Sequence, residues 1–143
     1  MPLTESSATT RQGFSALFGT DALPLSDNLQ LQAKTLLGSL GRQARLELIS
    51  RSIQIPPAIC LYIDRHGKLQ LLGRHPQAKQ IRLWLHNSHY LAELFKEVEL
   101  LFELQRCSEA LPPLAGGSRF CIGLTSAGPV AYFETPSHHA RNG

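Results

Sequence analysis

The sequence predicts an α+β domain in which an antiparallel sheet of about four strands packs against an N-terminal helix and a long central helix. Apolar residues recur at helical spacing over residues 27–50 and again over residues 91–105. Two β-prone segments, residues 58–72 and 120–133, each fold back across a glycine-containing turn. A lone hairpin is marginal in water, so we expect both hairpins to share one sheet that the helices cover.

The size and composition of the chain are those of one small globular domain. Its 143 residues are 43% hydrophobic and 17% charged. The net charge of +3 permits an acidic partner, but it falls short of the Lys and Arg density typical of nucleic-acid-binding domains. No run of about 18 apolar residues is present, so we expect no membrane span and no membrane partner.

The two ends of the chain are polar. The start is rich in Ser and Thr and lacks the apolar core of a secretion signal. We therefore expect a mostly disordered segment over residues 1–22, a single α+β domain over 23–134 and a disordered tail over 135–143. Within the first segment, the apolar cluster at residues 14–18 is either a helical turn packed on the domain or a docking stub. These features favour a soluble cytoplasmic protein, and the richness in Leu, Arg and Gln is compatible with a bacterial one.

The first helix is predicted over residues 27–50, after the N-cap chemistry of residues 26–28. Gly38 and Gly41 weaken this prediction, since each costs about 1 kcal/mol relative to Ala inside a helix. They either allow another element to approach closely or break the helix, in which case residues 44–48 would begin a strand. We favour the helix. Its apolar positions are Leu29, Ala33, Leu36, Leu37, Leu40, Ala44 and Leu48.

A hairpin is the clearest local signal in the chain. The β-prone run 58–63 leads into a turn at residues 64–67, and an alternating run follows over residues 68–72. Gly67 supplies the positive φ that a tight turn requires. Two prolines, at positions 56 and 57, separate this hairpin from the first helix.

Two further helices and a second hairpin complete the order. Pro76 suits the start of a short helix, and Ser88 is placed to cap a longer one after a break at residues 87–88. The second hairpin pairs residues 120–124 with 130–133 across a turn at residues 125–129. The short helix has the apolar face Ile81, Trp84 and Leu85, and the long helix has Leu91, Leu94, Phe95, Val98, Leu101 and Phe102.

No reactive constellation emerges, so we assign no catalytic residue, no metal ligand and no cofactor. His86 and His89 are three residues apart and could ligate a metal only with a third ligand from elsewhere, so we interpret them as surface histidines. We interpret the cysteines Cys60, Cys107 and Cys121 as buried small hydrophobes; Cys107, beside Arg106, is the best thiol candidate. The carboxylates Glu93, Glu97, Glu99 and Glu103 occupy the hydrophilic side of the long helix, where solvated charges are normal.

The charges are distributed unevenly along the chain. A basic half faced by the glutamates of the long helix would steer association with a second copy or an acidic partner. The plainer interpretation is two ordinary solubilising faces. Exposed aromatics that could stack bases are missing from the first hairpin except Tyr62, which argues against nucleic acid. The basic residues are Arg42, Arg45, Arg51, Arg65, Lys68, Arg74, Lys79 and Arg82.

Three functions remain open. The first is a non-catalytic regulatory or adaptor domain that acts by protein–protein contact, as a homodimer or with a protein partner, through surplus apolar residues such as Trp84, Phe95 and Phe102. The second is a small-ligand sensor with a pocket between the sheet and the long helix, where Ala58, Gly123 and Ala131 would leave room. The third is an enzyme using Cys107 or a histidine pair.

The order helix, hairpin, helix, hairpin is similar to that of the Roadblock and longin-like scaffolds. This resemblance lies in element order alone, and no residue motif carries it. The chain departs from those scaffolds where its middle helix is split at residues 87–88.

Overall fold

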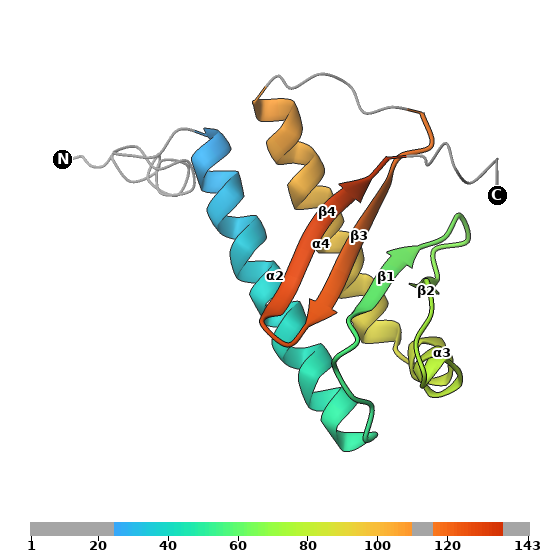
Figure 1. Cartoon of the computed structure of the whole chain (residues 1–143). Coiled ribbons are helices and arrows are strands. Elements are labelled where there is room, and N and C mark those ends of the chain that lie inside the picture. The colour runs from blue at the N-terminus through green and yellow to red at the C-terminus, as the bar shows by residue number, and fades with distance from the viewer. Residues whose placement is uncertain (1–24, 110–115, 136–143) are drawn as a thin grey trace.

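A computed structural model describes residues 25–109 and 116–135 of the chain. It confirms the α+β class and the four-stranded antiparallel sheet (Figure 1). The expectations for residues 1–22, for the apolar cluster at 14–18 and for most of the tail fall outside the described ranges. The elements are α2 (Leu25–Ser50), β1 (Ile59–Ile63), β2 (Leu69–Leu72), α3 (Ala78–His86), α4 (His89–Ser108), β3 (Arg119–Thr125) and β4 (Gly128–Glu134).

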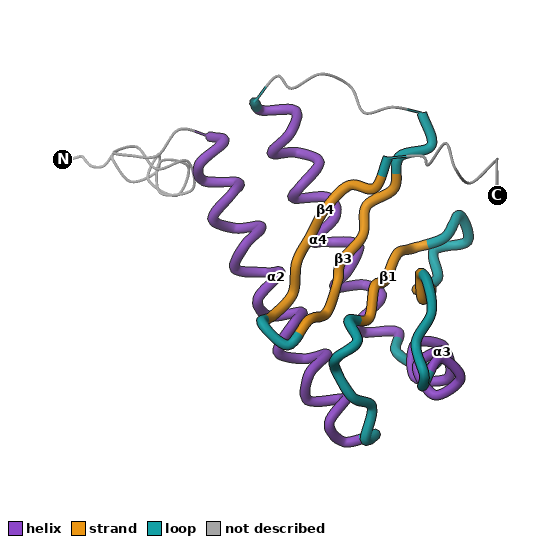
Figure 2. Tube along the Cα trace, in the orientation of Figure 1, coloured by secondary structure: helices purple, strands orange, loops and turns teal. Residues whose placement is uncertain are grey.

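The two hairpins join through their first strands. The sheet order is β2-β1-β3-β4, and every neighbouring pair is antiparallel. Leu61 lies opposite Leu71 on one side and Ile122 on the other, so the register is continuous across the joint. Strands β2 and β4 are the two edges, and Figure 2 shows α2 and α4 on one side of β3 and β4.

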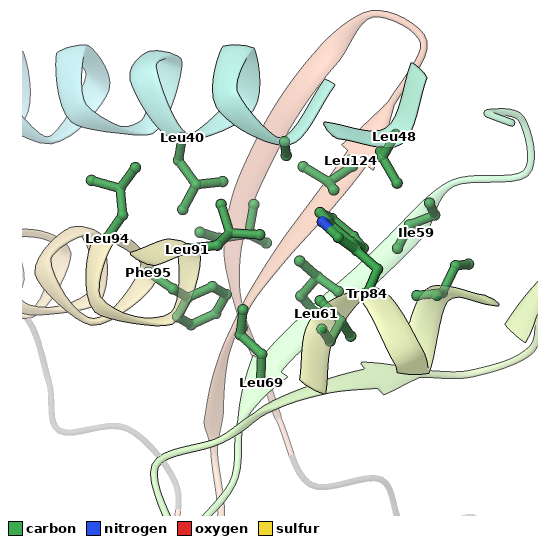
Figure 3. Close-up of a cluster of buried hydrophobic side chains, with 14 of the residues drawn as sticks. Leu40, Leu48, Ile59, Leu61, Leu69, Trp84, Leu91, Leu94, Phe95 and Leu124 are labelled. Atoms are coloured by element: carbon green, nitrogen blue, oxygen red, sulfur yellow. The ribbon is translucent and has the colours of Figure 1, made fainter. Parts of the chain in front are cut away.

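Alternation along the strands directs one set of side chains into the core. Ile59 and Leu61 of β1 and Leu124 of β3 point toward the helices (Figure 3). Ile122 of β3 belongs to the same buried core. The helices α2 and α4 pack against each other in antiparallel directions. The opposite set of strand residues, which includes Tyr132 on β4, forms the outer face of the sheet.

The centre of the core contains the largest apolar side chains of the helices. Trp84 of α3 and Phe95 of α4 are both completely buried. The ring of Phe120 lies edge-on to Phe95, with centroids 5.7 Å apart, and against Phe133 at 5.2 Å. These ring contacts connect α4 to β3 and β4.

Helix α2 continues through both of its glycines, as predicted. A Cβ on Gly41 would lie 2.5 Å from Pro129 Cγ, which is too close for any real contact. Gly41 therefore allows the start of β4 to approach α2 closely. Of the two predicted explanations for this glycine, close approach of another element is the one that applies.

Three local details differ from the prediction. Helix α3 begins at Ala78 and not directly at Pro76; the imidazole of His75 accepts a hydrogen bond from the Gln77 N–H at 2.9 Å at this helix start. Ser88 occupies the N-cap position of α4, but its hydroxyl donates to the Trp84 carbonyl at 2.6 Å and does not cap the helix. The second hairpin turns over only two residues, so its strands are longer than predicted.

A helix that is both long and apolar enough to cross a membrane is not found in the described part of the chain.

Candidate binding site

A cavity lies between the tip of the first hairpin, α3 and the start of α4. It has a volume of about 440 Å³, within the usual range of ligand sites. Its walls carry six basic side chains and one carboxylate, and its apolar lining comes from Leu69, Leu85 and Ala92. The basic residues are His66, Lys68, Arg82, His86, His89 and Lys96, and the acidic residue is Glu93.

The hairpin tip owes its shape to Asp64. One carboxylate oxygen accepts the backbone N–H groups of His66 at 2.8 Å and Lys68 at 3.0 Å. The other accepts from the side chain of Gln70 at 2.8 Å. The hydrogen bond from the Lys68 backbone and that from Gln70 hold the pKa of Asp64 below its usual value. With Gly67 at a φ of 78°, this turn presents His66 and Lys68 to the cavity.

Helix α3 supplies the opposite wall. Its apolar face, which includes Ile81 and Trp84, is buried against the core. The exposed face carries Lys79, Arg82 and His86, which are three and four residues apart and so lie along one side of the helix. Arg82 and His86 line the cavity. Burial of one helix face thus determines the placement of a basic stripe on the other.

The junction between α3 and α4 brings a third wall. The Asn87 side chain donates a hydrogen bond to the Leu83 carbonyl at 3.1 Å, and the Ser88 hydroxyl donates one to the Trp84 carbonyl at 2.6 Å. Chain direction changes here, and α4 begins with His89 at the cavity wall. The positive end of the α4 dipole adds to the charge of the side chains around it.

The single carboxylate of the cavity is already paired. Glu93 Oε2 lies 3.2 Å from Lys96 Nζ, one helical turn along α4. Lys96 Nζ also lies 3.4 Å from the point where a Cβ on Gly67 would stand, so the lysine reaches across to the hairpin tip. Excess positive charge remains at Lys68 and Arg82, both exposed. The cavity is suited to a negatively charged ligand.

The structure brings His86 and His89 to the same cavity, and it adds His66, which the sequence analysis did not connect with them. Among the described residues, no group of three His, Cys, Asp or Glu side chains is placed to hold a metal ion. The histidine pair thus contributes to a basic wall in this arrangement. The sequence feature that pointed to this basic cavity was the surplus of Lys and Arg over residues 42–82, although Lys96 lies outside that range.

The three cysteines occupy different environments. Cys121 is buried, as predicted, and burial raises the pKa of its thiol. Cys60 is half-buried on the outer face of the sheet, close to Tyr132, whose pKa is also raised by burial. Cys107 is exposed at the end of α4, so the prediction that it is buried is wrong.

The glutamates of α4 largely match their prediction. Glu93, Glu97 and Glu103 are exposed, whereas Glu99 is half-buried. Its burial, reinforced by the neighbouring charge of Glu103, raises the pKa of Glu99. The hydrophilic side of α4 is therefore not uniformly solvated.

The apolar residues considered for an interface lie mainly inside the molecule. Trp84 and Phe95 each have 0% of their surface exposed, so neither presents a side chain to a partner in this structure. Phe102 is half-buried, and its interface role stays a prediction. The small residue Gly123, expected to leave room beneath α4, faces the outer side of the sheet beside Cys60.

Comparison of this chain with protein-family models, with curated proteins and with solved structures gives no match.

Proposed function

We propose that this chain is a non-catalytic adaptor domain whose basic cavity captures an acidic segment of a partner protein. The observation that carries the proposal is the composition of the cavity walls, in which six basic side chains from three elements surround one carboxylate. That carboxylate is neutralised by Lys96 at 3.2 Å. Complementary charge of this kind favours capture of an acidic ligand and speeds its approach.

Two features support an extended protein segment as the ligand. The basic stripe of α3 continues past the cavity to Lys79, and the hairpin tip continues to the exposed Arg65. A ligand that follows both ridges is longer than the cavity itself. The apolar lining from Leu69, Leu85 and Ala92 suits aliphatic side chains between the acidic ones.

Nucleic acid fits the same charge less well. Single-stranded nucleic acid is held by aromatic rings on which its bases stack. The lining residues of this cavity include no Phe, Tyr or Trp. A protein segment with carboxylates therefore matches the lining better than a base-bearing polymer.

The test is fluorescence anisotropy with a short labelled peptide of alternating glutamate and leucine. The double variant Lys68→Gln/Arg82→Gln is expected to bind the peptide roughly tenfold more weakly, because each exposed charge pair contributes up to about 1 kcal/mol. The matched control is Arg51→Gln/Arg74→Gln, which removes the same charge from exposed positions outside the cavity. Equal affinity of both double variants, or tighter binding of single-stranded DNA, would contradict the proposal.

A second proposal is self-association through the helix layer. Leu31 on α2 and Leu100 and Leu104 on α4 keep 56%, 54% and 44% of their surface exposed. Leu100 and Leu104 lie one turn apart on the same side of α4. Light scattering is expected to give the mass of a dimer that Leu100→Glu converts to a monomer. A monomeric parent protein would contradict this second proposal.

A further inference from the structure

A second hollow lies along α2 and shares no lining residue with the basic cavity. A cavity of about 230 Å³ opens between α2 and the turn that joins β3 to β4. A neighbouring cavity of about 250 Å³ shares Arg45, Leu48 and Ile55 with it. The two form one trough along α2, and together they reach the size of small-molecule sites.

The part of the trough between α2 and the β3–β4 turn is mainly apolar, whereas Gln54 and Ser126 add polar groups to the neighbouring part. Leu48 and Leu124 are buried at the base of the trough, and Ile55 and Pro129 form its sides. Near the turn, the hydroxyl of Thr125 is already satisfied, because it donates to the Gly128 carbonyl at 2.8 Å and accepts the Ala127 N–H at 3.1 Å. A ligand tail placed between α2 and the β3–β4 turn therefore meets mainly apolar surface and gains free energy by being buried there.

Two arginines border this apolar surface. Arg42 and Arg45 are three residues apart on α2, so they lie on the same side of the helix. Both are exposed, and Arg42 Nη2 donates to the hydroxyl of Ser39 at 3.2 Å. The ion pairs found over residues 25–109 and 116–135 are Glu93–Lys96 and Arg119–Glu134, so neither arginine is matched by a carboxylate.

We propose that this trough binds a small amphipathic carboxylate, with the apolar tail over Leu48 and Leu124 and the carboxylate between Arg42 and Arg45. Guanidinium groups bind carboxylates through paired charge-assisted hydrogen bonds. An apolar cleft with few convergent polar groups is the usual form of a small-ligand site. This site shares no lining residue with the basic cavity, and it does not depend on the adaptor proposal.

Gly38 keeps the trough open. A Cβ at this position would meet only Arg42 Nη1, at 3.5 Å, so a small side chain fits without disturbing the core. A longer side chain would project from α2 over the trough. Gly38→Leu is therefore a steric block, and Gly38→Ala is its matched control.

The experiment is titration calorimetry of the full chain with decanoate, below the concentration at which it forms micelles. The parent protein is expected to bind it saturably at one site. Arg42→Gln/Arg45→Gln is expected to weaken binding roughly tenfold, and Gly38→Leu to abolish it. Gly38→Ala and Arg51→Gln, an exposed position that lines neither cavity of the trough, are expected to bind as the parent does. Thermal unfolding of each variant verifies that it is folded.

Two ligand controls separate the charge from the tail. Decylammonium keeps the tail and reverses the charge, and acetate keeps the charge and lacks the tail; neither is expected to bind. Equal binding of decylammonium, or undiminished decanoate binding by the double arginine variant, would show non-specific contact with apolar surface and overturn the proposal. Absence of decanoate binding to the parent protein would overturn it as well.

Discussion

The indole nitrogen of Trp84 donates a hydrogen bond of 2.7 Å to Oε1 of Glu47. This bond joins α3 to α2 across the core, and the indole nitrogen points toward α2 in Figure 3. The other oxygen of Glu47 accepts from the side chain of Gln43, one turn earlier on α2. A completely buried tryptophan thereby satisfies its one polar group, and the short helix α3 is held in a defined position.

Removal of this acceptor is expected to destabilise the fold. Glu47→Ala leaves the indole N–H of Trp84 buried without a partner, at a cost of about 1–3 kcal/mol in the free energy of unfolding. Glu47→Gln keeps an acceptor oxygen and is expected to lose less. Urea denaturation followed by tryptophan fluorescence measures both changes. An unchanged midpoint for Glu47→Ala would show that water satisfies the indole.

The two glycines of α2 are expected to respond oppositely to alanine. Gly41→Ala places a Cβ where Pro129 now lies, so α2 and β4 must separate, with an expected loss of about 1–3 kcal/mol. Gly38→Ala meets no such obstacle and gains helix propensity of up to about 1 kcal/mol. Thermal unfolding of the two variants side by side compares them. A stabilising effect at both positions would show that the contact with Pro129 yields easily.

The Asp64 turn is expected to make stability dependent on acid. Its carboxylate has a lowered pKa in the folded state, so the unfolded chain binds the proton more readily. The stabilisation is therefore complete above the ordinary value of 3.8 and is lost as the pH falls below it. Asp64→Asn is expected to unfold at a lower temperature than the parent at pH 7, with the gap closing below pH 3.8. A gap that stays constant with pH would exclude the carboxylate charge as the cause.

The fold was predictable because its signals are local and periodic. The apolar stripe of α2 predicts a helix that continues through two glycines, and the turn has a glycine at position 67, where the backbone adopts a positive φ. Joining of the two hairpins followed from the instability of each alone. The placement of Ser88 was less predictable, since its hydroxyl had a competing acceptor in the Trp84 carbonyl.

The basic cavity was harder to predict than the elements that form it. His66, His86 and Lys96 come from three parts of the chain, and their proximity depends on how α3 packs against the core through Trp84. No spacing in the sequence encodes that packing. The sequence also does not show how many of the large apolar side chains are buried in the core. Trp84 and Phe95 were therefore predicted at an interface, although both are buried.

The half-buried Glu99 is expected to reduce stability at neutral pH. Burial and the neighbouring Glu103 raise its pKa in the folded state, so the folded chain binds the proton more tightly than the unfolded one. Stability therefore falls as the pH rises from the ordinary value of 4.5 through the raised value. Glu99→Gln removes this penalty and is expected to stabilise the protein at pH 7 by less than about 1 kcal/mol, because the site is partly solvated.

The comparison that isolates Glu99 uses Glu97→Gln, which removes the same charge from an exposed position on the same helix. Glu97→Gln is expected to change the unfolding temperature little at any pH. For Glu99→Gln, the gain over the parent should be present at pH 7 and shrink as the pH falls toward 4.5, because the raised pKa lets the folded parent take up the proton above that pH. Equal effects of the two variants would mean that net charge, and not burial of Glu99, determines the result.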